Sequence, residues 1–307
     1  MKNRASASQV VTTLTNYARG VSQDRASALA EFIAPTVPVG AATGKFKSFD
    51  DKNAFQVVDT SRAIGGGAKR LEFAATDPDY NCQPQALEIP IDDFERELAG
   101  DADTELEQGK VDTLITSATT SFENKVFTII KGAQAAAGGV GVWSDANNDP
   151  VDEIDAQIEA ISTATGMMPN RIVIGLSAWR IFRKHAKVIA RQPGAQIIGV
   201  TLSQAAAMLL NPAIEIRVGI LSKDLAKTGA AKNTANIVGG EVFVFYASPS
   251  PTQYDASFAK TFRTRNGGVD QVRKYRDEGS RSDIIAVDWS EDIQVVSPIC
   301  GRRITLS

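Results

Sequence analysis

The longest regular pattern in the chain occupies residues 104–136, which read TELEQGKVDTLITSATTSFENKVFTIIKGAQAA. Apolar residues recur there every three or four positions, at Val111, Leu114, Ala118, Phe122, Val126, Ile129 and Ala133. This spacing predicts one amphipathic helix, with a capping box from Thr104 to Glu107 at its start and Gly138-Gly139 at its end. Such a helix would be about 50 Å long, roughly three times the mean length in globular proteins.

The residues before this helix, 44–91, are typical of two β-strands joined by a turn. The apolar residues that mark the two arms are Phe46, Phe49, Phe55, Val57 and Val58, then Leu71, Phe73, Tyr80, Leu87, Ile89 and Ile91. Gly65-Gly66-Gly67 lies between them and predicts a hairpin whose arms, fully extended, would each reach on the order of 60 Å. Because an isolated hairpin buries too little apolar area to offset its ordering entropy, this one must lie on a neighbouring molecule or on its own domain.

The N-terminal residues, 1–39, predict an arm more than a folded unit. They begin with polar, helix-compatible sequence and end with EFIAPTVPV at residues 31–39. Pro35 and Pro38 push the residues before them toward extended backbone. We therefore expect the end of this segment to lie extended on another surface.

The residues after the long helix alternate between helix and strand signals. Asp152 is the predicted cap of a helix that ends at Gly166, and Ser177 is the predicted start of another. The other predicted elements are a helix at residues 201–210 and strands at residues 171–176, 214–218, 241–246, 284–287 and 293–296. This alternation predicts a compact α+β domain, and the last two strands could return to the first sheet.

Composition and charge exclude several classes of protein. The 307 residues are 43% hydrophobic and 22% charged, as expected for a soluble globular protein. A net charge of −3 does not favour a dedicated DNA- or RNA-binding protein, because binding to phosphate needs a positive field. Cys82 and Cys300 stand alone, so we expect small buried side chains there. The sequence has neither a signal-peptide pattern nor a run of about 18 apolar residues, so neither secretion nor a membrane span is predicted.

Two stretches look superficially like ligand-binding loops. Residues 65–70, GGGAKR, lack the spacing of a phosphate-binding loop and follow a strand that turns back, so a hairpin tip is predicted. Residues 145–150, DANNDP, begin like a calcium loop. Pro150 stands where glycine is required, however, and Ala156 where a bidentate glutamate is required. We interpret this stretch as a polar connector between domains.

Candidates for catalysis are few. His185 is the single histidine, and beside Phe182 on a predicted helix it is interpreted as a packing residue. The acidic run at residues 92–97, DDFERE, is typical of a solvated face or of a salt-bridge surface between subunits. No nucleophile lies beside a base, so the sequence predicts no enzyme and no bound cofactor or metal ion.

In its order of parts, the chain resembles the Hong Kong 97-type major capsid proteins of tailed bacteriophages. The phrases that carry the resemblance are IAPTVPV at residues 33–39, GKFKSFD at 44–50, TG at 165–166 with PNRIVIG at 169–175, and Arg276-Asp277-Glu278. The resemblance implies the α+β capsid fold of that family, with an N-terminal arm, an extended-loop β-hairpin, a long spine helix and an axial domain. The implied division is 1–39 for the arm, 40–92 for the extended-loop hairpin, 93–150 for the peripheral domain with its spine helix, 151–275 for the axial domain, and 276–307 for C-terminal strands that return to the core.

The resemblance also implies a function. The subunit would form hexamers and pentamers and close them into an icosahedral shell around double-stranded DNA. Its partners would be itself, a portal, a separate scaffolding protein and, in some shells, decoration proteins, without any membrane. It would be located in the virion after synthesis in the cytoplasm of the host bacterium. Some relatives carry a long N-terminal scaffolding segment, but only about 40 residues precede this hairpin, so a separate scaffolding protein, or none, is expected.

Assembly contacts are expected on the hairpin. Arg62, Lys69 and Arg70 place positive charge near its tip, where acidic groups of a neighbour could meet them; a solvated turn is the alternative. Phe55 and Phe73 are candidate apolar contacts on the arms. Some relatives cross-link this loop through a lysine and an asparagine, but no pattern here identifies such a pair.

The arm and the function leave alternatives open. Lys2, Arg4, Arg19 and Arg25 outnumber the acids of the first 30 residues, so the arm is a candidate lining for packaged DNA. An encapsulin-like nanocompartment shell would share the fold but enclose cargo enzymes. A soluble α+β enzyme is disfavoured by the single histidine, the absent motifs and the oversized hairpin.

Overall fold

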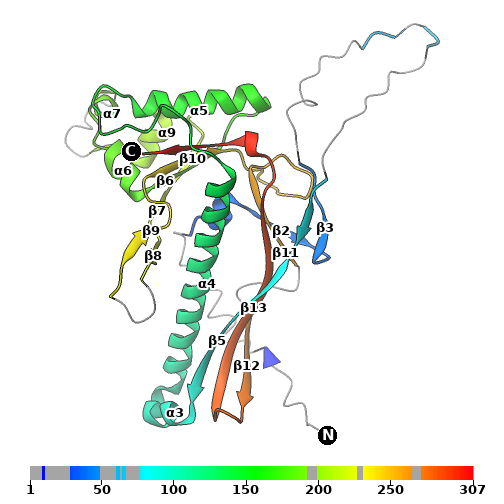
Figure 1. The fold of residues 1–307 in the computed structure, drawn as a ribbon, viewed down its shortest axis with the longest axis vertical. Helices are drawn as coiled ribbons and strands as arrows, with labels where there is room; N and C mark the ends of the chain where they lie inside the picture. The colour runs from blue at the N-terminus through cyan, green and yellow to red at the C-terminus, as the bar shows by residue number, and fades with distance from the viewer. Residues whose placement is uncertain are drawn as a thin grey trace.

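The computed structural model describes residues 9–10, 28–48, 60–62, 64–66, 77–191, 199–226, 231–264 and 271–306. This part of the chain contains two larger β-sheets, one beside a long helix and the other covered by shorter helices (Figure 1). The long helix and the first sheet form the elongated lower part of the molecule in Figure 1, and the second sheet lies at its upper end. The α+β organisation predicted from the sequence is confirmed.

The long helix, α4 (Asp103–Ala133), has 31 residues and ends at Ala133 instead of the predicted residue 136. Its predicted capping box is wrong, because the N-cap is Ala102, which makes no side-chain bond to the helix. A 3₁₀ turn, η1 (Gly100–Ala102), runs directly into α4 and leaves Thr104 inside the first helical turn. The first turn of α4 is instead favoured by the acidic residues Asp103 and Glu105, which interact with the helix dipole.

The larger sheet packs against the first half of α4. Its strand order is β1-β12-β13-β11-β2, and β5 also pairs with β13. These strands are β1 (Gln9–Val10), β2 (Thr36–Val39), β5 (Gln83–Asp92), β11 (Ala259–Thr264), β12 (Val272–Asp277) and β13 (Ser282–Val295). Val111, Ile115 and Ala118 of α4 share one buried cluster with Ile285 and Val287 of β13. The helix and sheet therefore form a two-layer unit around one core.

The smaller sheet has the order β14-β10-β6-β7. Its strands are β6 (Arg171–Gly175), β7 (Glu215–Gly219), β10 (Glu241–Phe245) and β14 (Gly301–Thr305). Its helices are α5 (Pro150–Thr165), α6 (Leu176–Phe182), α7 (Ala186–Ala190) and α9 (Leu202–Met208). All five residues of β10 are buried, because both faces of the strand are covered. Phe243 and Phe245 share a buried cluster with residues of α4, and Val242 and Val244 share another with residues of α5.

Helix α5 begins one turn earlier than the sequence suggested. Its N-cap is Asp149, whose side chain accepts a hydrogen bond from the Val151 amide, so the predicted cap at Asp152 is wrong. Pro150 occupies the first helical turn, where its missing N–H costs nothing. Gly166 ends the helix with a left-handed φ of 67°, as predicted.

Residues 28–39 belong to the folded core, so an N-terminal arm would end before residue 28. The segment forms a short helix, α2 (Ala30–Ile33), so the predicted extended backbone is wrong for residues 31–33. It then forms β2, which is extended as predicted and pairs in parallel with β11. Leu29, Ala30 and Ile33 are at most 1% exposed. Pro38 is compatible with this arrangement because β2 is the last strand of its sheet, where a missing backbone N–H is tolerated.

Two parts of the chain pair differently from the sequence-based expectation. Residues 83–92, predicted as the end of the hairpin's second arm, form β5, which pairs along its whole length with β13. Residues 284–287 and 293–295, predicted to lie in separate strands, belong to the single strand β13. After β13, the 3₁₀ turn η2 (Pro298–Cys300) leads into β14, which pairs with β10 in the smaller sheet.

The two sheets are joined by a shared core. Phe122 and Phe127 of α4 belong to the same buried cluster as Phe243 and Phe245 of β10. Strand β11 and the first four residues of β12, which the sequence division put in the axial domain, lie in the larger sheet. We propose that the peripheral domain combines residues 83–133 with residues 259–295, and that the smaller sheet and its helices form the axial domain.

Candidate assembly surfaces

The loop root, residues 42–47 and 77–82, is the place where the predicted hairpin joins the fold. There β3 (Thr43–Lys45) pairs antiparallel with β4 (Asp79–Asn81). Two further backbone bonds extend this pairing, from the Phe46 amide to the Pro78 carbonyl (3.0 Å) and from the Cys82 amide to the Ala42 carbonyl (2.8 Å). The chain between them therefore leaves and re-enters the fold at one place, as the base of a hairpin requires.

An aromatic stack fastens the loop root to the larger sheet. The ring of Phe262, on β11, lies 4.7 Å from that of Tyr80 at 17° and 5.2 Å from that of Phe46 at 30°. The same buried cluster contains Cys82, whose Sγ lies 3.4 Å from the Phe262 carbonyl oxygen. Burial raises the pKa of the Cys82 thiol, which keeps it protonated and unreactive, as expected for a small buried side chain. The loop root is thus a packed platform that holds both ends of residues 46–78 in one place.

The predicted hairpin contacts fall only partly within the described residues. Arg62 is exposed, and the neighbouring Ile64 side chain is fully exposed at 106%. Gly65 has a left-handed φ of 80°, which fits the predicted turn. The candidates outside the described residues are Phe55, Lys69, Arg70 and Phe73 on the hairpin and Lys2, Arg4, Arg19 and Arg25 on the arm.

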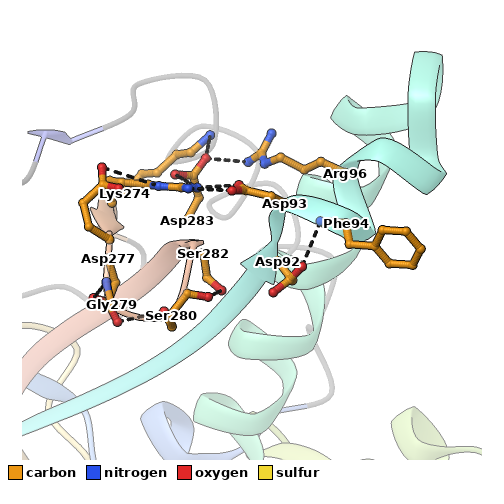
Figure 2. A network of polar contacts seen from close by, with 12 residues as sticks. Asp92, Asp93, Phe94, Arg96, Lys274, Asp277, Gly279, Ser280, Ser282 and Asp283 are labelled. Atoms are coloured by element: carbon orange, nitrogen blue, oxygen red, sulfur yellow. Dashed lines mark hydrogen bonds and ion pairs between the residues drawn. The ribbon is translucent and has the colours of Figure 1, made fainter.

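A second candidate surface, the peripheral tip, consists of residues 92–107 and the turn between β12 and β13. Asp92 caps α3 (Asp93–Ala99) by accepting a hydrogen bond from the Phe94 amide at 2.8 Å. Asp93 and Arg276 form a bidentate pair at 2.5 and 2.6 Å. The Arg276 guanidinium holds the pKa of Asp93 below its usual range. These contacts tie the start of α3 to β12, and Figure 2 shows the surrounding network.

Arg96 is the centre of that network. Its guanidinium lies 2.6 Å from Asp103, 2.5 Å from Glu107 and 3.1 Å from Asp283, and Lys274 pairs with the last two of these acids. Burial would raise the pKa of Glu107, but hydrogen bonds from Lys274 and Arg96 outweigh it and lower that pKa. The acidic run is therefore engaged in salt bridges within one chain that lock α3 to α4 and to the β12–β13 hairpin.

The face of α3 opposite this network is apolar. Phe94 and Leu98 are 64% and 73% exposed and lie four residues apart, so they share one helix face. Figure 2 shows the Phe94 ring pointing away from the network. Glu97 and Asp101 are exposed nearby. The sequence interpretation missed this pair, although two apolar residues at helical spacing inside an acidic run were a usable signal.

His185 is placed differently from the prediction. Helix α6 ends at Phe182, and His185 is the N-cap residue of α7, 7% exposed, with Nε2 lying 3.3 Å from the Asp145 carbonyl oxygen. It lines a hollow of about 450 Å³ together with Trp143, Arg180 and Lys184. Packing remains the role that the structure supports for this histidine.

The other polar residues singled out from the sequence have structural roles. Asp149 caps α5, and Asp145 accepts a bond from the Asn147 amide, so the connector is ordered by its own side chains. Within the described ranges, no three His, Cys, Asp or Glu side chains are grouped as a metal ion would require. Across the same residues, no helix combines the length and apolar character needed to cross a bilayer.

One buried acid was not anticipated. Glu123, near the middle of α4, is 0% exposed, and its Oε2 accepts hydrogen bonds from the amides of Leu29 (2.7 Å) and Ala30 (2.9 Å). Burial raises its pKa from the ordinary 4.5 to about 7. The sequence offered only a weak signal, because Glu123 lies beside the apolar stripe, four residues before the buried Phe127.

The known proteins that this chain is similar to include several phage proteins. No protein-family model matches the chain. It is 26% identical over 268 residues to the major capsid protein of Burkholderia phage BcepMu, a match that covers 85% of each protein. A solved phage-related protein from Bordetella bronchiseptica has a TM-score of 0.73 at 24% identity, over 98% of both chains. The capsid of cyanophage P-SCSP1u has a TM-score of 0.57 at 11% identity, over 90% of this chain and 86% of that one.

These likenesses agree with the geometry. The structural matches establish the fold, which has the loop root, the long helix beside a sheet, and a second sheet with its helices. The Burkholderia phage protein adds sequence similarity across most of the chain. Fold and sequence together confirm the predicted resemblance of this chain to the Hong Kong 97-type major capsid proteins of tailed bacteriophages.

Proposed function

We propose that this chain is the shell subunit of a phage head, forming hexamers and pentamers that close into an icosahedral capsid around double-stranded DNA. The observation that carries the proposal is its similarity to a major capsid protein over 85% of both lengths, in a chain with a capsid fold. In this proposal the chain functions through contacts between subunits, and no residue is given a catalytic role.

The loop and the peripheral tip are the proposed contact surfaces. Both ends of residues 46–78 are anchored in the loop root, so this segment can press on a neighbour without detaching from its own subunit. It supplies the cations Arg62, Lys69 and Arg70 and the apolar residues Phe55 and Phe73. The peripheral tip offers exposed acids and the apolar pair Phe94 and Leu98. Opposite charges on two such surfaces would steer and orient assembly.

The remaining partners follow from the same proposal. A portal, a separate scaffolding protein and packaged double-stranded DNA are expected, and decoration proteins are compatible with it. The four cations of the N-terminal arm, Lys2, Arg4, Arg19 and Arg25, would face the DNA. The protein would be made in the cytoplasm of the host bacterium and end in the virion.

Electron microscopy and sedimentation velocity of the purified full-length protein test the proposal. Closed shells, tubes or ring-shaped capsomers are expected. Particles from infected or induced cells should protect double-stranded DNA from nuclease. Shells filled with protein cargo and free of DNA would favour the encapsulin-like alternative, and a homogeneous monomer at all concentrations, with or without phage lysate, would overturn the proposal.

Variants of the two surfaces test the contacts separately from the fold. We expect Arg62→Glu, and the double change Phe94→Ser with Leu98→Ser, to reduce the yield of closed particles at least tenfold. Because these side chains are exposed, the free energy of unfolding should change by less than about 0.5 kcal/mol for each substitution. Glu159→Gln, which changes an exposed acid of α5 outside both surfaces, is the control and should assemble normally. Normal assembly of the double variant would remove the tip from the proposal.

A further inference from the structure

Glu123 joins two parts of the chain that are about 90 residues apart in sequence. It lies on α4, and the two amides that it binds belong to the N-cap residue Leu29 and the first residue, Ala30, of α2. Both amides donate to Oε2, and the fully buried Oε1 has no hydrogen-bond partner among the described residues. A single carboxyl oxygen therefore holds the start of α2 on the long helix.

The charged groups that neighbouring elements bring to this region are engaged with other partners. Glu291 of β13 pairs with Lys125 and Arg263, Lys260 of β11 with Asp255, and Arg217 of β7 with Glu215. Lys223 of β8 (Ser222–Asp224) donates to Asn124, and Arg171 of β6 donates to the Phe32 carbonyl. Lys131 of α4 pairs with Glu241, and Glu31 of α2 lies near Arg263. Within the described residues, Glu123 thus has no cationic partner to stabilise its ionised form.

The protonation state of Glu123 matters because of this isolation. A buried carboxylate without a cation is costly, so burial favours the neutral acid, although the two amide bonds oppose this by favouring the anion. The neutral acid can still accept both amide bonds through Oε2. The ionised form gains most by reaching water, which requires α2 to move off α4.

The segment that would move is also held from its other side. The Phe32 ring lies beneath two guanidinium groups, 4.8 Å from that of Arg171 and 4.3 Å from that of Arg217. These arginines come from β6 and β7 of the smaller sheet. Residues 28–34 thus connect the long helix, the smaller sheet and the N-terminal part of the chain.

We propose that Glu123 is a proton-dependent latch, whose neutral carboxyl holds residues 28–34 against α4 and whose ionisation favours release of this segment. The inference concerns the single chain and goes beyond the proposed shell function. If that function holds, the latch would set how firmly the N-terminal arm is rooted in its own subunit.

Amide hydrogen exchange of the full-length protein between pH 5 and pH 8 tests the latch, with the assembly state followed by sedimentation. Protection of residues 28–34, corrected for the intrinsic rate at each pH, should fall by roughly 70-fold across this range if the released carboxyl has its ordinary pKa. Protection of the buried strand β10 should stay unchanged. Glu123→Gln, which keeps an oxygen acceptor without a charge, should give the same protection at both pH values.

Glu107→Gln is the matched control, because it changes a glutamate on the same helix that is paired with Arg96 and Lys274. It should leave the pH response of residues 28–34 intact. Equal protection of residues 28–34 at pH 5 and pH 8 in the wild-type protein would overturn the latch, even if Glu123→Gln failed to fold. Hydrogen exchange is measured within one chain, so it tests the latch separately from the shell function. If the protein assembles but residues 28–34 show no pH response, the latch is refuted and the shell function is not. If the pH response is present but the protein never assembles, the shell function is refuted and the latch is not.

Discussion

Replacing Phe262 by alanine tests whether the aromatic stack holds the loop root. Phe262 is 0% exposed and contacts both Tyr80 and Phe46. Truncating a buried phenylalanine to alanine typically costs about 3–5 kcal/mol, through lost transfer free energy and the cavity left behind. Each aromatic pair contributes about 0.5–1.5 kcal/mol of its own. We therefore expect Phe262→Ala to lower the free energy of unfolding by about 4 kcal/mol, and Phe262→Leu by clearly less.

Urea unfolding of the full-length protein measures this change, and a double-mutant cycle with Tyr80→Ala isolates the stack. The coupling energy of the pair should be about 1 kcal/mol, since the two rings are in direct contact. Hydrogen exchange of the β3 and β4 amides should accelerate more than that of β10. Phe243→Ala is the matched control, because Phe243 is equally buried on β10 but packs against Phe127 at 5.6 Å, away from the root.

The reasoning would be refuted by any of three results. Phe262→Ala could cost less than about 1 kcal/mol, which a fully buried ring does not allow. Its effect could add to that of Tyr80→Ala without coupling. Phe243→Ala could loosen β3 and β4 as much as Phe262→Ala does, in which case the root responds to global stability and not to its own stack.

Two further predictions concern the smaller sheet and its helices. A Cβ on Gly175 would lie 1.8 Å from the Gly239 carbonyl oxygen, so Gly175→Ala should lower the urea midpoint by an amount equivalent to about 2–3 kcal/mol or more. Gly240→Ala is the control, because the nearest atom to its added Cβ would lie at 3.7 Å. It should change the stability by less than about 0.5 kcal/mol. Equal effects would show that the close approach of the two backbones is not rigid. Asp149 and not Asp152 caps α5, although both acids contact Arg191. Thermal unfolding should therefore show a loss of stability of about 1–2 kcal/mol for Asp149→Ala and of less than about 0.5 kcal/mol for Asp152→Ala. The reverse order of the two losses would contradict the cap.

Elements with strong local signals were predicted well. The 31-residue helix α4 follows from its apolar spacing, and the end of α5 at Gly166 follows from the glycine that adopts a left-handed φ. Helix starts were predicted less well, because several residues near a helix start have side chains that could cap it. Asp152 and Thr104 both looked suitable, but Pro150 and the η1 turn move the two starts toward the N-terminus.

The candidate surfaces were predicted only in part. The cations and aromatic residues of the hairpin could be chosen from composition, and Arg62 is exposed as a contact residue must be. Phe94 and Leu98 were missed because a short helix inside an acidic run looks solvated all round. Glu123 was missed because its burial depends on α2, which reaches it from a distant part of the sequence.

By itself, the sequence determined the long helix and its approximate length, the helices α5, α6 and α9, the strands β6, β7 and β10, and the family resemblance, but neither α2 nor α3. These features depend on spacing, on glycine and proline, and on short phrases, all of which act over a few neighbouring residues. Only the tertiary structure decided that β5 pairs with β13, that β14 joins the smaller sheet, and that residues 28–34 are bound by Glu123. The physical reason is that an alternating strand specifies its buried face but not its partner, and a buried charge is recognised only once the elements that exclude water from it are in place.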